Sequence, residues 1–259
     1  AGQTATTIPA VPRGLYALSA RFGRLQWASL LSAAEQYARL GVPVSRSLVN
    51  DIQANRARIE ASPALRKTFM PDGKLLEVGD RIRSVNLAAL LTSLRVKGPG
   101  DFYNGALGAD IAAAVQNAGG TLTADDLRNY RPEWKAATEV KHGNEIVYLA
   151  YPPRSASGPS VITDGSDVAE ILNRYLADIA SGDLSGQALS GRSGFVVVDR
   201  AANAVACMTT MNTPFGAGLG ADAFGLNLAA GDAAQAATPL IGPALMVNPF
   251  VLSLIHISE

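Results

Sequence analysis

The side chains best suited to chemistry gather at the ends of two neighbouring predicted strands. Ser193 precedes a run of β-branched and aromatic residues, and Thr210 and Asn212 end a second run that follows a short turn. Two such runs predict a hairpin, which would bring hydroxyls and an amide to the mouths of adjacent strands. A hydroxyl can act as a nucleophile once a base takes its proton. The structural alternative is an ordinary strand threonine and a turn-capping asparagine.

The chain offers few other catalytic groups. It has two histidines and one cysteine, Cys207, which leaves little material for a Ser-His relay and excludes a cysteine-based metal cluster. The stretch from Gly216 to Gly220 lacks the Lys-Ser/Thr pair and the glycine spacing of a phosphate-binding loop. We expect there a loop with left-handed glycines, and we expect no metal and no cofactor.

The composition indicates a globular protein rather than a disordered one. Of 259 residues, 48% are apolar and 17% are charged. The 22 basic and 22 acidic residues balance, so charge gives no reason to expect a nucleic acid or an acidic membrane as partner. Residues 233–258 are uncharged, but prolines at 239, 243 and 249 interrupt them, so we expect no membrane span.

Helices must position most of this chain, because helical periodicity dominates its first two-thirds. After residue 142 the pattern changes to short β-branched runs. The layout fits helices layered on a mostly antiparallel sheet. The predicted helices are 26–40, 45–61 with Ser45 as N-cap, 86–97, 107–117, one opening at 123–126, and 168–179, and Ser62-Pro63 opens a further short turn by the Ser-then-Pro signal. The predicted strands are 146–149 and a buried hairpin of 195–199 and 204–210.

The hairpin also carries a family resemblance. Residues 195–206, followed by 210–216, resemble the start of the small subunit of gamma-glutamyltransferases. Other segments resemble the same family in the same order, from about residue 7 to residue 250. These segments are 23–27, 41–45, 69–73, 79–80, 101–105, 118–120, 122–127, Tyr130 and 151–153.

The resemblance implies an α+β fold, an incomplete four-layer αββα sandwich of the N-terminal-nucleophile hydrolase type. Such precursors cut themselves before a threonine, whose hydroxyl then attacks a gamma-glutamyl amide such as that of glutathione. The new α-amino group has a pKa of about 7.7–8.0, so it can serve as base near neutral pH, whereas a lysine at about 10.4 stays charged. The implied partners are a small gamma-glutamyl peptide, an amino-acid or water acceptor, and large and small subunits from one precursor; members are often exported.

The resemblance also divides the chain. Residues 1–191 correspond to the later, mostly helical part of the large-subunit region, and residues 192–251 to the first part of the small-subunit region. Residues 252–259 read unlike what precedes them, so we expect a non-native tail and exclude it from fold reasoning. We expect the chain to be an inactive internal piece of a longer protein, because the family's carboxylate-binding arginine and oxyanion glycines have no counterpart in it.

The nucleophile position is where the sequence departs from the family. Counting back from Phe195 without gaps places that position on Arg192, which has no nucleophilic hydroxyl. A one-residue slip in the loop would make Ser193 the nucleophile, and this is the assignment that we expect. Ser190 is a weaker candidate.

The resemblance assigns substrate binding to three further residues. Thr210 and Asn212 match positions that orient the nucleophile and bind the glutamyl group. Asp232 lies one place from the acidic residue that holds the substrate ammonium. Two alternatives stay open, namely a non-catalytic homologue that keeps the sandwich and an amidase with a different acyl specificity.

Overall fold

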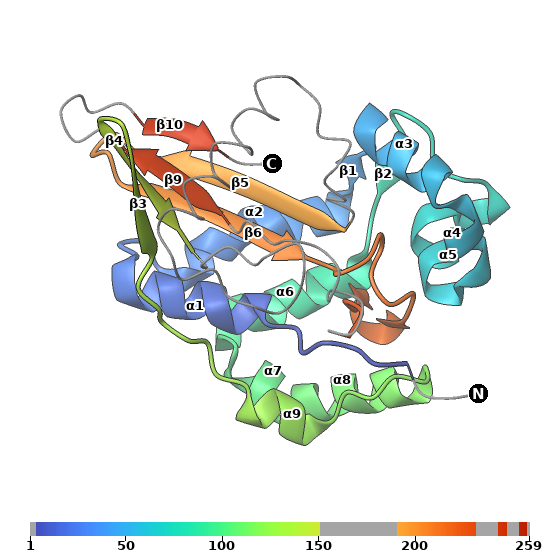
Figure 1. Cartoon of the computed structure of the whole chain (residues 1–259). Coiled ribbons are helices and arrows are strands. Elements are labelled where there is room, and N and C mark those ends of the chain that lie inside the picture. Colours follow the sequence, from blue (N-terminus) through green and yellow to red (C-terminus); the bar gives the residue numbers. More distant parts are fainter. Residues whose placement is uncertain (1–3, 151–190, 232–242, 248–253, 258–259) are drawn as a thin grey trace. The chain divides into compact units, whose positions relative to one another are not determined.

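The structure is a computed structural model that describes residues 4–150, 191–231, 243–247 and 254–257 (Figure 1). The chain divides into two compact units. We call the first the helical unit; it comprises Ala1–Pro132 and Met211–Asp232. The second, the sheet unit, comprises Glu133–Thr210 and Ala233–Glu259. This division follows packing, whereas the division at residue 192 concerns subunits and stays a prediction.

Most of the helical unit is built from short helices. Two small antiparallel ladders, β1–β2 and β7–β8, complete it. Its elements are α1 (Val11–Phe22), α2 (Trp27–Leu40), β1 (Val42–Pro43), α3 (Arg46–Ala54), α4 (Arg56–Ala61), α5 (Pro63–Phe69), η1 (Pro71–Gly73), β2 (Arg81–Ile82), α6 (Val85–Lys97), α7 (Gly100–Asn104), α8 (Ala106–Asn117), α9 (Ala124–Asn129), β7 (Gly220–Ala221), η2 (Asp222–Phe224) and β8 (Leu226–Asn227).

Helix starts in this unit follow side-chain caps. The Ser45 hydroxyl accepts a hydrogen bond from the Leu48 amide, and Ser62 caps α5 in the same way. Thr123 and Asp126 form a complete capping box at the start of α9, as predicted. The single helix predicted over 45–61 is wrong, because the chain leaves helical geometry at Asn55 (φ −112°, ψ 21°) and α4 begins after it.

One of the apolar clusters of the helical unit lies between α6, α7, α8 and α9, and another is formed around α3, α4 and α5. Ile111 and Val115, one turn apart on α8, are fully buried, which confirms the predicted apolar face of that helix. Phe102 and Tyr103 of α7 are each 1% exposed and pack in the same cluster with Leu127 of α9. Helix α7 was not predicted, because five residues are too few to show a periodicity.

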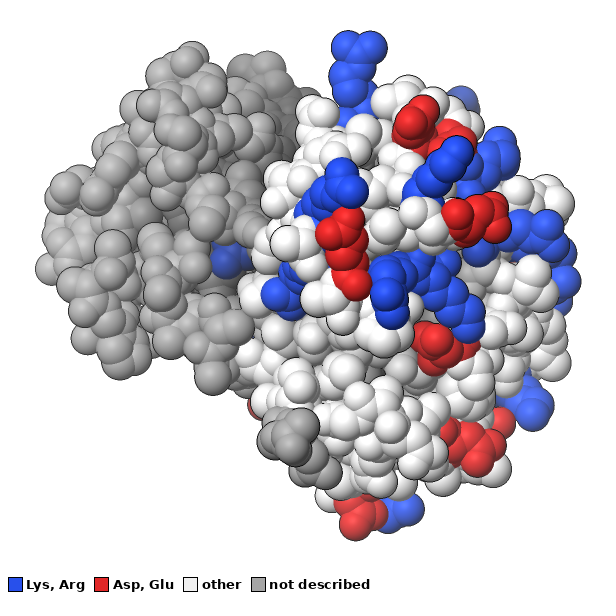
Figure 2. Space-filling view, turned by 90° about the vertical axis from the view of Figure 1, so that its right-hand side faces the viewer, with Lys and Arg blue, Asp and Glu red and all other residues white. Residues whose placement is uncertain are grey.

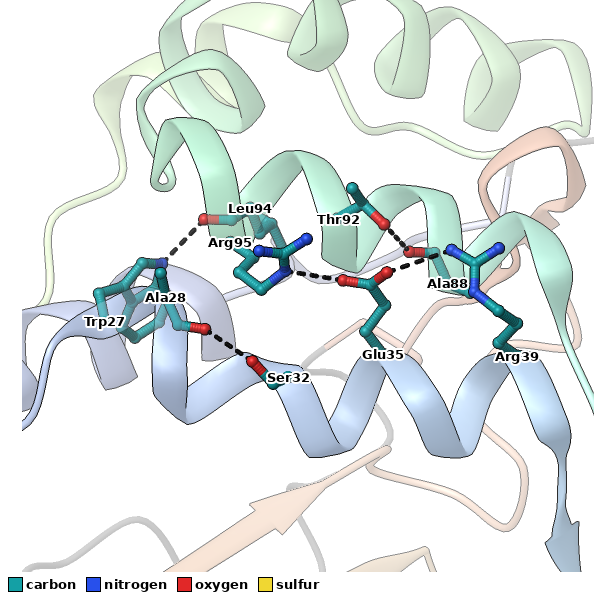
Figure 3. Close-up of polar contacts among 9 residues, drawn as sticks. All are labelled: Trp27, Ala28, Ser32, Glu35, Arg39, Ala88, Thr92, Leu94 and Arg95. Carbon is teal, nitrogen blue, oxygen red and sulfur yellow. Dashed lines mark hydrogen bonds and ion pairs between the residues drawn. The ribbon is translucent and has the colours of Figure 1, made fainter.

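Polar contacts join α2 to α6 along one side (Figure 3). The Trp27 indole N–H donates to the Leu94 carbonyl at 2.8 Å. Glu35 accepts from Arg95 on the neighbouring helix at 2.8 Å and from Arg39 one turn along its own helix at 3.1 Å. The hydrogen bond from Arg95 holds the pKa of the Glu35 carboxyl below its usual range. Both of these contacts between the two helices therefore lie in the last turn of α6, at Leu94 and Arg95.

Tyr103 ties the segment before α1 to the core. Its hydroxyl donates to the Pro9 carbonyl and accepts from the Arg13 amide at 3.2 Å. The Arg13 guanidinium lies over the ring, 3.9 Å from its centre. Burial raises the pKa of Tyr103 to about 12.

This raised pKa predicts a loss of stability at alkaline pH. An unfolded tyrosine ionises near pH 10, so between about pH 10 and pH 12 the folded state holds more protons than the unfolded state and the free energy of unfolding falls. We expect this group to contribute up to about 2.7 kcal/mol of that fall. Urea unfolding at pH 8 to pH 12 measures it.

The control for this experiment is Tyr103→Phe, which keeps the ring and removes the titrating hydroxyl. This variant should lose about 1 kcal/mol at pH 8 through its missing hydrogen bonds but decline less steeply above pH 10. Equal slopes in the two proteins would contradict the role given to Tyr103.

The sheet unit contains a four-stranded antiparallel sheet of order β10-β9-β4-β3. Its strands are β3 (Thr138–His142), β4 (Glu145–Leu149), β9 (Ala244–Val247) and β10 (Leu254–Ile257). Val147 of β4 lies opposite both Val140 and Met246, and all three are buried, so one face of the sheet is apolar. Strand β4 confirms the prediction at 146–149, whereas its partner β3 was not predicted. Strand β10 comes from the segment that we excluded from fold reasoning.

The predicted hairpin is present as β5 (Arg192–Val198) and β6 (Ala204–Thr210). The prediction that its strands are buried is wrong, since Phe195 is 52% and Val197 56% exposed. Within the described ranges the hairpin is a two-stranded sheet, so no third strand covers its edges. The helix predicted at 168–179 lies outside the described residues.

On the face shown in Figure 2, basic and acidic residues are interleaved rather than gathered by sign. Ion pairs along or between helices of the described chain include Arg56 with Glu60 at 2.7 Å and Lys67 with Asp222 at 3.4 Å. These side chains are largely exposed, so each pair stabilises the fold only slightly. The described part of this face carries no extended patch of one charge.

Candidate active site

The turn of the β5–β6 hairpin is fixed by Asp199. One carboxylate oxygen accepts from the amides of Ala201 and Asn203 at 2.8 and 2.9 Å, and the other accepts from the Asn203 side chain at 2.8 Å. Ala202 takes a left-handed conformation, with φ 61°. A turn held this firmly fixes which residues face each other along the two strands.

That register places Arg192, not Ser193, opposite Thr210. Ser193 lies opposite Thr209. Directly opposite residues of an antiparallel pair project from the same face, and successive residues alternate between faces. Thr210 therefore shares a face with Arg192, while Ser193 shares the other face with Thr209.

The hydroxyls at this end of the hairpin bind main-chain carbonyls. The Thr209 hydroxyl donates to the Ser193 carbonyl at 3.3 Å, and the Thr210 hydroxyl donates to the Gly191 carbonyl at 3.5 Å. The Ser193 side chain is exposed, whereas Arg192 is half-buried. Burial lowers the pKa of the Arg192 guanidinium.

Asn212 belongs to the helical unit and adopts a left-handed conformation, with φ 65°. Its side-chain amide donates to the Ala230 carbonyl at 2.7 Å. The Ala230 amide in turn donates to the Met211 carbonyl at 3.1 Å. Left-handed backbone in a residue other than glycine is uncommon and concentrates where surrounding contacts enforce it.

Asp232 and Ser190 lie outside the described residues. The segment just before Asp232 pairs with the start of the chain, where Thr7 donates to the Ala229 carbonyl at 3.1 Å and Gly231 donates to the Ala5 carbonyl at 2.9 Å. This pairing could not be predicted from the sequence, because the partners are more than 200 positions apart and neither segment alternates polar and apolar residues.

A glycine-rich loop follows Asn212 and returns to Ala230. Phe215, Gly216 and Gly218 have φ values of 59°, 74° and 69°, which confirms the prediction of a left-handed loop. Helix α4 and the start of α5 hold this loop through Arg58 and Ser62, which donate to the Gly216 and Gly218 carbonyls. Reasoning from sequence missed Arg58, since its hydroxyl partner lies 155 positions away.

No metal site is apparent in the part of the chain that the structure describes, where no three His, Cys, Asp or Glu side chains come together. Among the same residues, no helix has the length and apolar character needed to cross a membrane.

Known proteins similar to this chain identify its family. The family model described as Gamma-glutamyltranspeptidase matches residues 1–163. Glutathione hydrolase 2 of Arabidopsis thaliana is 33% identical over 176 residues, which are 67% of this chain and 29% of the relative. Glutathione hydrolase of Aspergillus flavus is 31% identical over 173 residues, or 65% of this chain and 28% of that protein. The chain thus spans less than a third of the length of these curated relatives.

Two solved structures show the same fold. The cephalosporin acylase from Bacillus halodurans matches 93% of this chain and 57% of its own, with a TM-score of 0.67 and 20% identity. The gamma-glutamyltranspeptidase from Pseudomonas nitroreducens, complexed with L-DON, matches 56% of this chain and 43% of its own, with a TM-score of 0.50 and 26% identity. The fold is therefore α+β, of the N-terminal-nucleophile hydrolase type, and the chain belongs to the gamma-glutamyltranspeptidase family.

Proposed function

We propose that the protein containing this chain transfers or hydrolyses the gamma-glutamyl group of small peptides such as glutathione. The family match over residues 1–163, with relatives named glutathione hydrolases, is the observation that carries this proposal. Water or an amino acid is the acceptor. Residues 1–191 and 192–251 then belong to the large and small subunits of one precursor.

The proposed nucleophile is the Ser193 hydroxyl. Scission of the Arg192–Ser193 peptide bond converts the Ser193 amide into an amine, which takes the hydroxyl proton. The oxygen attacks the gamma-carbonyl carbon, the leaving amine departs with that proton, and an ester remains on Ser193. Attack by water or an amino acid on the ester releases the gamma-glutamyl product and restores the hydroxyl.

The hairpin geometry sets a condition on this mechanism. In the uncut chain Ser193 faces away from Thr210, because Arg192 occupies the opposing position. Bringing Ser193 opposite Thr210 requires the released strand end to shift by one residue. Such a shift turns its side chain to the other face of the hairpin. Thr210 would then orient the nucleophile, and Asn212 and Asp232 would bind the glutamyl group and its ammonium.

A non-catalytic homologue is the second candidate, and the same register favours it. Arg192 occupies the family's nucleophile position when that position is counted back from Phe195 without gaps, and it lies directly opposite Thr210. Arginine has no nucleophilic hydroxyl, and its guanidinium would fill the place of the attacking group. In such a protein the sandwich would bind a ligand or partner and the peptide bond before Ser193 would stay intact.

Turnover by the complete protein separates these candidates. We expect hydrolysis of gamma-glutamyl-4-nitroanilide, and much slower hydrolysis of glutaryl-4-nitroanilide, which lacks the α-ammonium. A protein that cleaves the glutaryl compound equally well or better is an amidase of different acyl specificity. An uncut protein that turns over neither compound is the non-catalytic homologue.

A further inference from the structure

The loop between Asn212 and Gly218 is held in place by a cation from a distant helix. Arg58 of α4 donates from one terminal nitrogen of its guanidinium to the Thr213 hydroxyl at 3.1 Å and to the Gly216 carbonyl. The Thr213 hydroxyl also donates to the Gly216 carbonyl at 2.7 Å, and the Gly216 amide donates back to the Thr213 carbonyl at 2.9 Å. One nitrogen of Arg58 thus closes a tight turn immediately after Asn212.

Among the residues that the structure describes, the Arg58 side chain hydrogen-bonds only to this turn. Its Nε is buried and has no hydrogen-bond partner, and the guanidinium forms no ion pair with a carboxylate in the described ranges. Arg58 is half-buried, and a partly buried cation with no carboxylate partner among the described residues depends on its hydrogen bonds to offset the lost hydration. The neighbouring Arg56 on the same helix is exposed and pairs with Glu60, as surface arginines commonly do.

The turn itself needs external support. Asn212 and Phe215 both have positive φ values, 65° and 59°, and neither is a glycine. Backbone of this kind persists only where surrounding contacts over-determine it. Besides Arg58, the Phe69 ring meets the Phe215 ring edge-on at 4.8 Å, and Ser62 binds the Gly218 carbonyl at 2.6 Å. Of these three side chains, Arg58 is the one that contacts Thr213, the residue directly after Asn212.

We propose that Arg58 is a positioning residue that sets the orientation of Asn212 for binding of the gamma-glutamyl group. This inference rests on the proposed function. Arg58 touches no substrate in this role; it fixes the Thr213–Gly216 turn, and the turn fixes the backbone of Asn212 from one side while Ala230 fixes its side chain from the other.

The test is Arg58→Ala in the complete protein, with Arg56→Ala as the matched control on the same helix. A contact that binds the glutamyl group equally in the ground state and the transition state changes KM and leaves kcat unaltered. We expect the KM for gamma-glutamyl-4-nitroanilide to rise about tenfold in Arg58→Ala, with kcat within about twofold of the wild type. Arg56→Ala should match the wild type, and guanidinium ion at millimolar concentration should partly restore the KM of Arg58→Ala.

The outcomes are separable. An active wild type whose KM is unchanged by Arg58→Ala overturns the role of Arg58 and leaves the proposed function standing. A wild type that turns over no gamma-glutamyl amide overturns the proposed function. In that case, hydrogen exchange of residues 212–218 still decides whether Arg58 holds the loop, because exchange should accelerate in Arg58→Ala but not in Arg56→Ala. Should Arg58→Ala fail to fold, Arg58→Gln, which keeps one donor, is measured in its place.

Discussion

Replacing Ser193 with alanine in the complete protein is expected to abolish both the cut before residue 193 and the turnover of gamma-glutamyl amides. The hydroxyl forms the intermediate in each reaction, so its loss removes the chemical step itself. Loss of a nucleophile of this kind costs on the order of 10³-fold or more in kcat. Gel electrophoresis reports the cut, and release of 4-nitroaniline reports the turnover.

Two further variants make this result specific to the hydroxyl. Ser193→Thr keeps a nucleophilic oxygen and should still cut. Arg192→Ala should cut at the same bond, because the attacked carbonyl is main chain and the Arg192 side chain supplies no reacting atom. A Ser193→Ala protein that is cut and active at the wild-type rate would contradict the assignment. Loss of activity in Arg192→Ala but not in Ser193→Ala would instead favour Arg192, the position reached by counting back from Phe195 without gaps, as the residue that matters.

Substituting Gly216 with alanine is expected to destabilise the helical unit by more than about 4 kcal/mol. A Cβ at this position would lie 2.2 Å from the Leu228 carbonyl oxygen and 2.6 Å from the Met211 methyl group, and Gly216 itself is buried. The left-handed φ of 74° adds the smaller penalty of about 1 kcal/mol that any L-residue meets there. Because the carbonyl is main chain, the clash is relieved only by moving β8 or the loop.

Gly73→Ala provides the matched control for this effect. Gly73 has nearly the same φ, 78°, but a Cβ there would meet nothing within 4 Å. It should therefore show the conformational penalty alone, about 1 kcal/mol. Urea unfolding of the two variants separates the two contributions, and equal losses of stability would contradict the packing account of Gly216.

Local signals in the sequence predicted several helix starts, although α1 and α7 were not predicted. The caps at Ser45, Ser62 and Thr123 hold in the structure, since each depends on residues at most three positions away. The break between α3 and α4 at Asn55 was not predicted, because the helical spacing of apolar residues continues across it. Strand β3 was not predicted, because its five residues, Thr138–His142, include too few apolar residues to show a strand pattern.

In the candidate site, too, features that depend on nearby residues could be predicted and features that depend on distant residues could not. The family resemblance points to Thr210 and Asn212, and to Ser193 through a one-residue slip. The predicted hairpin that carries Ser193 and Thr210 forms, with exposed rather than buried strands. Arg192 lies opposite Thr210 because the turn at Asp199 fixes the register of the two strands. No sequence motif specifies that register. The contact of Arg58 with the loop after Asn212 spans 155 positions, so only the folded chain brings the two together.

The mass of the complete purified protein tests the central claim most directly. We expect two chains, with N-terminal sequencing of the smaller one giving Ser193 as its first residue followed by Gly194 and Phe195. A single uncut chain, or a second chain that begins at any other residue, would contradict the claim that a freed Ser193 hydroxyl carries the reaction.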